Sequence, residues 1–300
     1  MASKPKTTKK PSTISVNINR LADNTIQIEA TINKKEIKLE HDRVLAQLQK
    51  TTEIKGFRKG KAPKERVEKA IGQNEIYQRV INQLLPKVYQ RSIEQHQLKP
   101  IIAPRAELVS AKEGEDWQVK FITCELPKVD LNNYQEEIKT ITAKEAIWTP
   151  EKDKKIAEEP QDESLKKAQQ FQKIIDILAK TIKVNLPKIL IDNEVSQKLA
   201  GLIEKTEKMD LSIDQYLSSI GQTIDSIKQG YRQESEKNWK LELALNKIAD
   251  EENIIVSDQD IDSALTKIKD KEEKKQLANQ RYLLSSMIRR QKTLEFLQNL

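Results

Sequence analysis

Side chains suited to catalysis or metal binding are scarce in this sequence of 300 residues. It contains two histidines, His41 and His96, and a single cysteine, Cys124. A zinc site takes three or four His, Cys or carboxylate ligands, and these residues are too few to supply a His/Cys set. We expect Cys124 to pack as a small core side chain on a strand. The sequence therefore predicts no catalytic residue, no metal site and no cofactor.

Nucleotide-dependent chemistry also lacks its sequence signature. No glycine-rich segment followed by Gly-Lys-Ser/Thr, which would cradle phosphates, is present. The acidic residues between 144 and 163 are dense and mixed with lysines, which is typical of a solvated segment. We therefore expect a binding protein that works without ATP.

One segment does carry binding chemistry. Residues 56–63 read Gly-Phe-Arg-Lys-Gly-Lys-Ala-Pro, with a glycine on each side of the Phe-Arg-Lys triplet. Glycine permits tight turns, so the triplet can be presented at a tip. Phe57 can anchor in a shallow pocket, while Arg58 and Lys59 can meet carboxylates or phosphates. A solvated basic loop is the alternative interpretation, and these residues alone leave both open.

The apolar periodicity on either side of this segment predicts a small α+β domain. Isoleucine and valine alternate with polar residues over 14–32, which indicates a β-hairpin. Over 33–88 the apolar residues recur every three or four positions, which indicates three helices with the basic segment after the first. Alternation returns over 106–121. The order ββ-ααα-ββ predicts a domain over residues 13–143.

The rest of the chain is predicted to be helical. Residues 164–300 have apolar side chains at helical spacing and few glycines, which indicates an all-α domain. Aromatic residues make up only 4% of the sequence, so we expect thin cores and an elongated shape. Two prolines and dense charge over 144–163 predict a linker. The Lys-, Thr- and Pro-rich residues 1–12 predict a disordered tail.

Several helical segments of residues 164–300 carry two adjacent apolar residues. Adjacent residues point in different directions on a helix, so some of them could line an exposed apolar surface while the others pack in the core. Such a surface suits weak, promiscuous contact with unfolded chains. The candidates for this contact are Ile174, Ile191, Leu202, Ile203, Leu283 and Leu284.

Positive charge is concentrated in the first half of the chain. Residues 1–143 hold 26 Lys and Arg against 18 Asp and Glu, whereas residues 164–300 hold 23 against 21. A basic domain favours a polyanionic partner such as nucleic acid. No secretory signal and no apolar run long enough to span a membrane is evident, and one cysteine excludes an internal disulfide. We therefore expect a cytoplasmic protein.

The segment 56–63 resembles the ribosome-binding signature of trigger factor, the bacterial chaperone at the ribosomal exit tunnel. That signature, Gly-Phe-Arg-x-Gly-x-x-Pro, matches Gly56, Phe57, Arg58, Gly60 and Pro63. The order of strands and helices over residues 13–143 is similar to the family's N-terminal domain. Residues 164–300 resemble its helical domain more loosely, most clearly over 184–194.

This resemblance implies different roles for the two domains. The loop is expected to contact a protein and RNA of the large ribosomal subunit near the exit tunnel, and the helical domain to shield unfolded nascent polypeptides. Whether the free protein forms a homodimer is left open. The ribosome-binding residues implied are Gly56, Phe57, Arg58, Lys59, Gly60, Lys61 and Pro63.

The sequence departs from the family in one respect. Trigger factor usually carries a β-rich prolyl-isomerase domain between these two parts, and here only residues 144–163 separate them. We therefore expect no isomerase activity. The alternatives are an RNA-binding protein that uses its basic half, a prolyl isomerase by family label, and a periplasmic chaperone, against which the missing signal peptide argues.

Overall fold

The structure, a computed structural model, describes residues 14–146, 163–267 and 271–300. It divides into two compact units. The first comprises Met1–Leu126 with Pro187–Leu190, and the second comprises Pro127–Leu186 with Ile191–Leu300. The predicted tail, and residues 147–162 of the predicted linker, lie outside the described residues.

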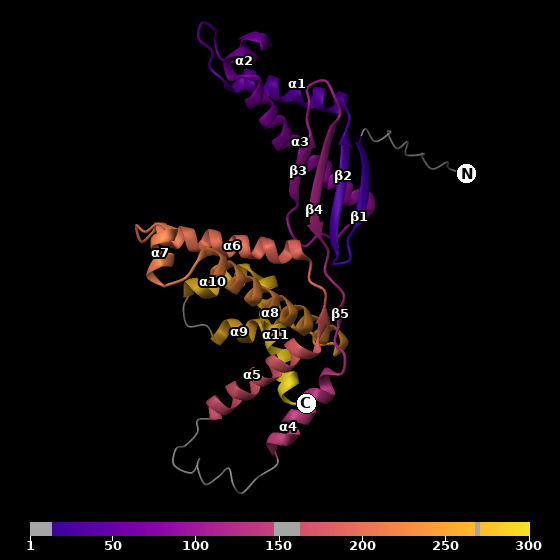
Figure 1. Cartoon of the computed structure of the whole chain (residues 1–300), viewed down its shortest axis with the longest axis vertical. Helices are drawn as coiled ribbons and strands as arrows, with labels where there is room; N and C mark the ends of the chain where they lie inside the picture. The colour runs from indigo at the N-terminus through magenta and orange to yellow at the C-terminus, as the bar shows by residue number, and fades with distance from the viewer. Residues whose placement is uncertain (1–13, 147–162, 268–270) are drawn as a thin grey trace, which may run out of the picture. The chain divides into compact units, whose positions relative to one another are not determined.

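The first unit is a four-stranded antiparallel sheet with three helices, as the periodicity predicts (Figure 1). The strand order is β1-β2-β4-β3. The hairpin of β3 and β4 therefore joins the hairpin of β1 and β2 through the antiparallel pairing of β4 with β2. The helices lie between β2 and β3 in sequence. The elements are β1 (Ile14–Arg20), β2 (Thr25–Ile32), α1 (Lys34–Thr51), α2 (Lys64–Ile71), α3 (Gln73–His96), β3 (Arg105–Ser110) and β4 (Trp117–Cys124).

One core holds this unit together. Alternate residues of β2 and β4 are buried because a pleated strand turns every second side chain to the same face. Ile28 of β2 lies opposite Phe121 of β4, and both are fully buried. The apolar stripe of α3, from Ile76 through Val80 and Leu84, joins the same core. The α1 and α2 faces complete it, so the loop between these two helices is carried by a packed scaffold.

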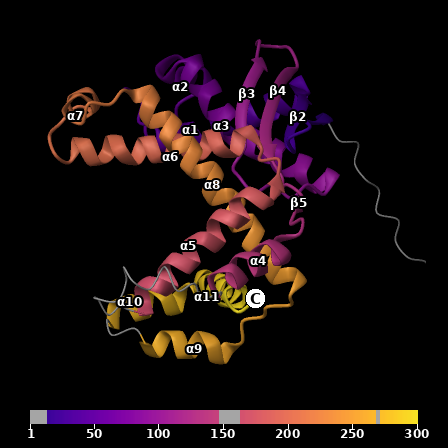
Figure 2. The same ribbon diagram turned by 60° about the horizontal axis from the view of Figure 1, so that its bottom comes forward.

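The second unit is helical, as expected, apart from a two-residue pairing between β5 and β6. Figure 2 shows α9, α10 and α11 close to one another, in agreement with their contacts. The elements are β5 (Val129–Asp130), α4 (Tyr134–Ala146), α5 (Glu163–Thr181), β6 (Lys183–Val184), α6 (Lys188–Glu207), α7 (Ile213–Ser219), α8 (Ile224–Glu251), α9 (Asp258–Lys267), α10 (Lys271–Asn279) and α11 (Arg281–Gln298).

The boundary between the units lies earlier in the chain than residue 143. Leu131, Tyr134 and Ile138 are buried in the core of the second unit with residues of α5, α8 and α11. Helical periodicity shows that α4 must bury one face, but it does not show against which core. Among the described residues, no helix is both long and apolar enough to cross a membrane.

Candidate functional site

The loop between α1 and α2 begins with a tight turn. The Phe57 N–H donates a hydrogen bond of 3.0 Å to the carbonyl oxygen of Ile54. Gly56, the third residue of this turn, has φ +88°. A type II turn requires positive φ at that position, which a side chain disfavours. No atom lies within 4 Å of a Cβ placed at Gly56, so the glycine is needed for its backbone conformation and not for space.

A second turn of the same kind follows directly. The Lys61 N–H donates a hydrogen bond of 2.9 Å to the carbonyl oxygen of Arg58, and Gly60 in the third position has φ +81°. The two glycines of the sequence motif are therefore the two residues that the consecutive turns require. Phe57 ends the first turn, and Arg58 and Lys59 begin the second, so the Phe-Arg-Lys triplet lies between the two glycines; we call these three residues the tip of the loop.

The base of the loop is fixed to the first unit. The side-chain amide of Gln49, in α1, donates a hydrogen bond of 2.6 Å to the carbonyl oxygen of Ala62. Ala62 is buried, and Ile54 at the other side of the loop packs against the core while partly exposed. The tip is consequently presented on a defined base.

The tip itself is an exposed aromatic among cations. Phe57 is 42% exposed. Lys55, Arg58, Lys59 and Lys61 are exposed as well, and among the described residues none of these four forms a salt bridge. An exposed aromatic side chain with free guanidinium and ammonium groups around it can bind an apolar pocket flanked by carboxylates or phosphates.

An ionic network joins the two helices behind the loop. Glu40 in α1 is only 4% exposed, and its carboxylate accepts a hydrogen bond of 2.6 Å from the Lys87 ammonium in α3. Arg43 approaches the same carboxylate at 3.3 Å, and Arg91 pairs with Glu36 at 2.5 Å. Because α1 carries the loop at its C-terminal end, this network positions the loop relative to the sheet.

The six predicted client-contact residues fall into two groups. Ile174, Ile191 and Leu284 are buried, so they stabilise the core of the second unit and are not available to a client in this structure. The other three reach the surface: Leu202 is partly exposed, Ile203 is 41% exposed and Leu283 is 47% exposed. In the two pairs of which both members are candidates, Leu202–Ile203 and Leu283–Leu284, the second residue points in another direction from the first, and the two lie at different depths.

Sequence reasoning missed further exposed apolar side chains. One group lies where α6, α7 and α8 follow one another, and it includes Met209 and Ile220. Another lies on α11, where Tyr282 is 90% exposed and Met287 is also exposed. These residues stand in turns and short helices, or outside the core stripe of α11, so the periodicity of apolar residues gives no signal for them.

The Cys124 thiol is buried and the His41 ring packs against another ring, so neither is placed as a reactive group usually is. Cys124 is fully buried at the end of β4, and burial raises the pKa of its thiol to about 11. The His41 ring lies against the Tyr77 ring, with 5.4 Å between the centroids. Within the described ranges, no three His, Cys, Asp or Glu residues gather in a way that could hold a metal ion.

Comparison with known proteins identifies the fold and the family. Residues 14–167 match the family model of the bacterial trigger factor protein, and residues 151–299 match the model of the trigger factor C-terminus. The trigger factor of Streptococcus gordonii is 27% identical over 146 residues, which cover 49% of this chain and 34% of that protein. The trigger factor of Streptococcus suis is 32% identical over 126 residues, which cover 42% of this chain and 30% of that protein.

The matched regions therefore span about a third of the length of these relatives. A solved structure described as "Promiscuous Substrate Recognition in Folding and Assembly Activities of the Trigger Factor Chaperone" is similar in fold, with a TM-score of 0.64. At 12% identity it covers 94% of this chain, and this chain covers 99% of it. On the two family matches, which together extend over residues 14–299, this chain belongs to the bacterial trigger factor family.

Proposed function

We propose that this chain is an ATP-independent chaperone that docks on the large ribosomal subunit through its basic loop and shields nascent polypeptides with its helical unit. The observation that carries the proposal is the exposure of Phe57 among unpaired cations, at a tip whose two glycines have positive φ. A glycine-shaped tip of this kind is suited to recognition, because its shape is set before the partner binds.

The docking chemistry follows from the side chains. Phe57 enters an apolar recess of a ribosomal protein near the exit tunnel, and Arg58 and Lys59 pair with its carboxylates or with adjacent RNA phosphates. Charge-assisted hydrogen bonds contribute about 1.5–3 kcal/mol each, and an aromatic anchor contributes about 2 kcal/mol or more. The binding free energy lost with all three contacts is therefore more than roughly 4 kcal/mol, which corresponds to a thousandfold change in affinity.

Client contact is the task of the second unit. Its exposed apolar side chains, including Ile203, Leu283 and Met287, are spread over several helices and do not form one deep site. Many weak apolar contacts bind an unfolded segment and release it as the segment buries its own surface, so the cycle needs no nucleotide. The flexible thioether of methionine helps such a surface adapt to different clients.

Co-sedimentation with ribosomes at physiological salt tests the docking proposal. Replacing Phe57, Arg58 and Lys59 together with alanine is expected to abolish stable co-sedimentation. A matched control replaces Leu39, Lys35 and Lys38, which are likewise one exposed apolar residue and two exposed cationic residues, at the other end of α1. This control is expected to bind like the parent chain. Equal binding by the two triple variants would refute docking through the loop.

The runner-up function is general RNA binding by the basic first half of the chain. Nonspecific RNA affinity falls steeply with salt because it is dominated by counterion release. A loop with an apolar anchor retains part of its affinity at high salt. Ribosome binding that falls with salt as steeply as binding to free RNA would favour the general RNA-binding function.

A further inference from the structure

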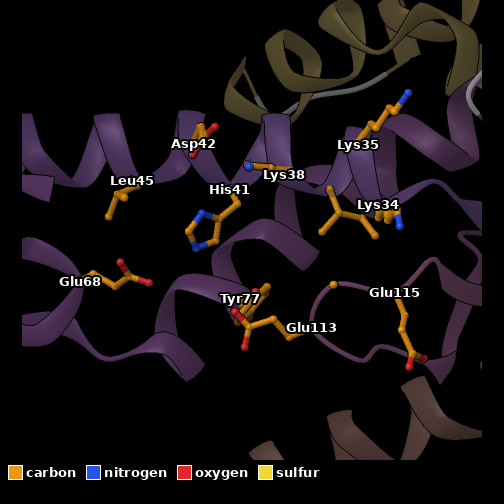
Figure 3. A pocket seen from close by; sticks show the side chains of 12 residues that line it. Lys34, Lys35, Lys38, His41, Asp42, Leu45, Glu68, Tyr77, Glu113 and Glu115 are labelled. Atoms are coloured by element: carbon orange, nitrogen blue, oxygen red, sulfur yellow. The ribbon is translucent and has the colours of Figure 1, made fainter. Parts of the chain in front are cut away.

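One cavity among the described residues lies in the first unit and belongs neither to the docking loop nor to the client surfaces. Its volume is about 510 Å³. It lies between α1, the ends of α2 and α3, and the turn between β3 and β4 (Figure 3). Ile37 and Leu45 of α1, both buried, supply apolar lining.

Aromatic rings form one wall of this cavity. The His41 ring packs at a tilt against the Tyr77 ring, and the centroids are 5.4 Å apart (Figure 3). Behind Tyr77 lies the buried Trp117 ring, at 6.0 Å between centroids. Trp117 is held in place because its indole N–H donates a hydrogen bond of 3.3 Å to the carbonyl oxygen of Lys112. The aromatic wall is therefore anchored from behind.

Two carboxylates line the cavity together with Tyr77. Burial raises the pKa of Tyr77, and a hydrogen bond with Glu113 and the negative charges of Glu113 and Glu68 raise it further. Glu68 comes from α2 and Glu113 from the turn between β3 and β4, and Figure 3 shows both side chains on the Tyr77 side of the cavity. None of the salt bridges among the described residues involves Glu68 or Glu113.

The remaining charged groups of the cavity belong mostly to α1, on the opposite side. Lys34, Lys35 and Lys38 line that side, and Figure 3 shows the Lys35 ammonium and the Asp42 carboxylate directed away from the rings. The acidic side of the cavity is consequently the side with Tyr77. A cation entering there finds two carboxylates beside the His41–Tyr77 ring pair.

We propose that this cavity binds an arginine side chain presented by an extended segment of another polypeptide. Its guanidinium group lies between Glu68 and Glu113 and packs against the partly exposed His41–Tyr77 ring pair, and its aliphatic stem lies along Ile37 and Leu45. A planar guanidinium can donate to two carboxylates at once and stack on a ring, which the compact ammonium group of lysine cannot do. The site goes beyond the proposed function, because it gives the first unit a protein-binding site separate from its docking loop.

The test is an NMR titration of the full ¹⁵N-labelled chain with the peptide acetyl-Gly-Ser-Gly-Arg-Gly-Ser-Gly-amide at low salt. Saturable shifts are expected at the amides of Tyr77, Glu68 and the turn between β3 and β4. The matched peptide carries citrulline, which has the shape of arginine without its charge, and is expected to bind at least about tenfold more weakly. A lysine peptide is expected to bind more weakly than the arginine peptide.

The double variant Glu68→Gln and Glu113→Gln is expected to weaken the arginine peptide at least about tenfold. The control, Glu65→Gln with Glu94→Gln, removes the same charge from exposed positions of α2 and α3 and is expected to bind like the parent chain. The two single variants of the site give intermediate affinities and serve if the double variant fails to fold. Ribosome co-sedimentation of the double variant is expected to be unchanged, which separates this site from the docking loop.

Three results would overturn the proposal: no saturable shift at the cavity, equal affinity for the arginine and citrulline peptides, or unchanged affinity in folded Glu68→Gln and Glu113→Gln variants. Equal affinity for the lysine peptide would overturn the guanidinium geometry.

Discussion

The side-chain amide of Gln49 closes the base of the basic loop by donating a hydrogen bond of 2.6 Å to the carbonyl oxygen of the buried Ala62. Replacing Gln49 with alanine leaves this carbonyl without its partner, at a cost of about 1–3 kcal/mol to the local structure. We expect faster hydrogen exchange in the loop and several-fold weaker ribosome binding. The exposed Gln78 of α3 provides the control, since Gln78→Ala is expected to change neither. An unchanged loop in the Gln49 variant would show that the turns alone set its shape.

The positive φ of Gly60 predicts opposite effects of alanine at two glycines. Gly60→Ala forces a side chain into the left-handed region, which costs about 1–2 kcal/mol, and so is expected to weaken ribosome binding. Gly201 lies inside α6 with no atom within 4 Å of an added Cβ. Gly201→Ala is therefore expected to stabilise the chain by about 0.4–1 kcal/mol without affecting ribosome binding. Thermal unfolding and co-sedimentation of both variants check this contrast.

The buried Glu40 carboxylate depends on Lys87. Lys87→Met removes the 2.6 Å partner and leaves Glu40 with Arg43 at 3.3 Å. We expect a destabilisation of about 1–3 kcal/mol, because a buried charge loses its main hydrogen bond. Hydrogen exchange of α1 and α3 peptides in the full chain would report it. Lys69→Met, at an exposed position of α2, is the control, and equal exchange in both variants would contradict a role for the network.

Asp260 predicts a pH dependence of the contact between α9 and α11. The Lys292 ammonium, at 2.6 Å, and the N–H and hydroxyl of Ser257 lower the pKa of Asp260 from 3.8 to about 2. Because the pKa is lowered in the folded chain, the contact stabilises α9 fully above pH 3.8, and this contribution is lost as the pH falls through 2. Carboxyl NMR shifts at pH 3.5 are expected to show Asp260 ionised, and more protonated after Lys292→Met. A protonated Asp260 in the parent chain at pH 3.5 would contradict the lowered pKa.

The chain is predicted to lack prolyl-isomerase activity, because only residues 144–163 separate the parts that resemble the two trigger factor domains. A protease-coupled assay with a proline peptide is expected to show turnover at background level. Turnover clearly above background from the pure chain, proportional to its concentration, would contradict this prediction.

The sequence predicts the backbone of the loop between α1 and α2 better than it predicts which apolar side chains are exposed. The loop depends on local chemistry: two glycines four positions apart specify two turns, and an aromatic residue between them is brought to the tip. The proposed client contact depends on which member of an apolar pair faces the core. Helical spacing alone could not separate Leu283, which is exposed, from Leu284, which is buried.

The periodicity of apolar residues does not predict contacts between residues far apart in the sequence. His41, Tyr77 and Glu113 are far apart in the sequence, and only the packing of α1 and α3 against the sheet brings them to one cavity. The assignment of α4 to the second unit has the same cause. Its apolar stripe is evident in the sequence, but its partners in α5, α8 and α11 come much later in the chain.

The central claim is that Phe57 touches the ribosome, and photo-crosslinking tests it most directly. Phe57→p-benzoylphenylalanine places a photoreactive group at the loop tip, and Leu39→p-benzoylphenylalanine places it at a comparably exposed position on α1. Irradiation of each variant with purified ribosomes is expected to yield a crosslink to a large-subunit protein only from position 57. The account would be contradicted if position 57 gave no ribosomal product, or if position 39 gave the same product in equal yield.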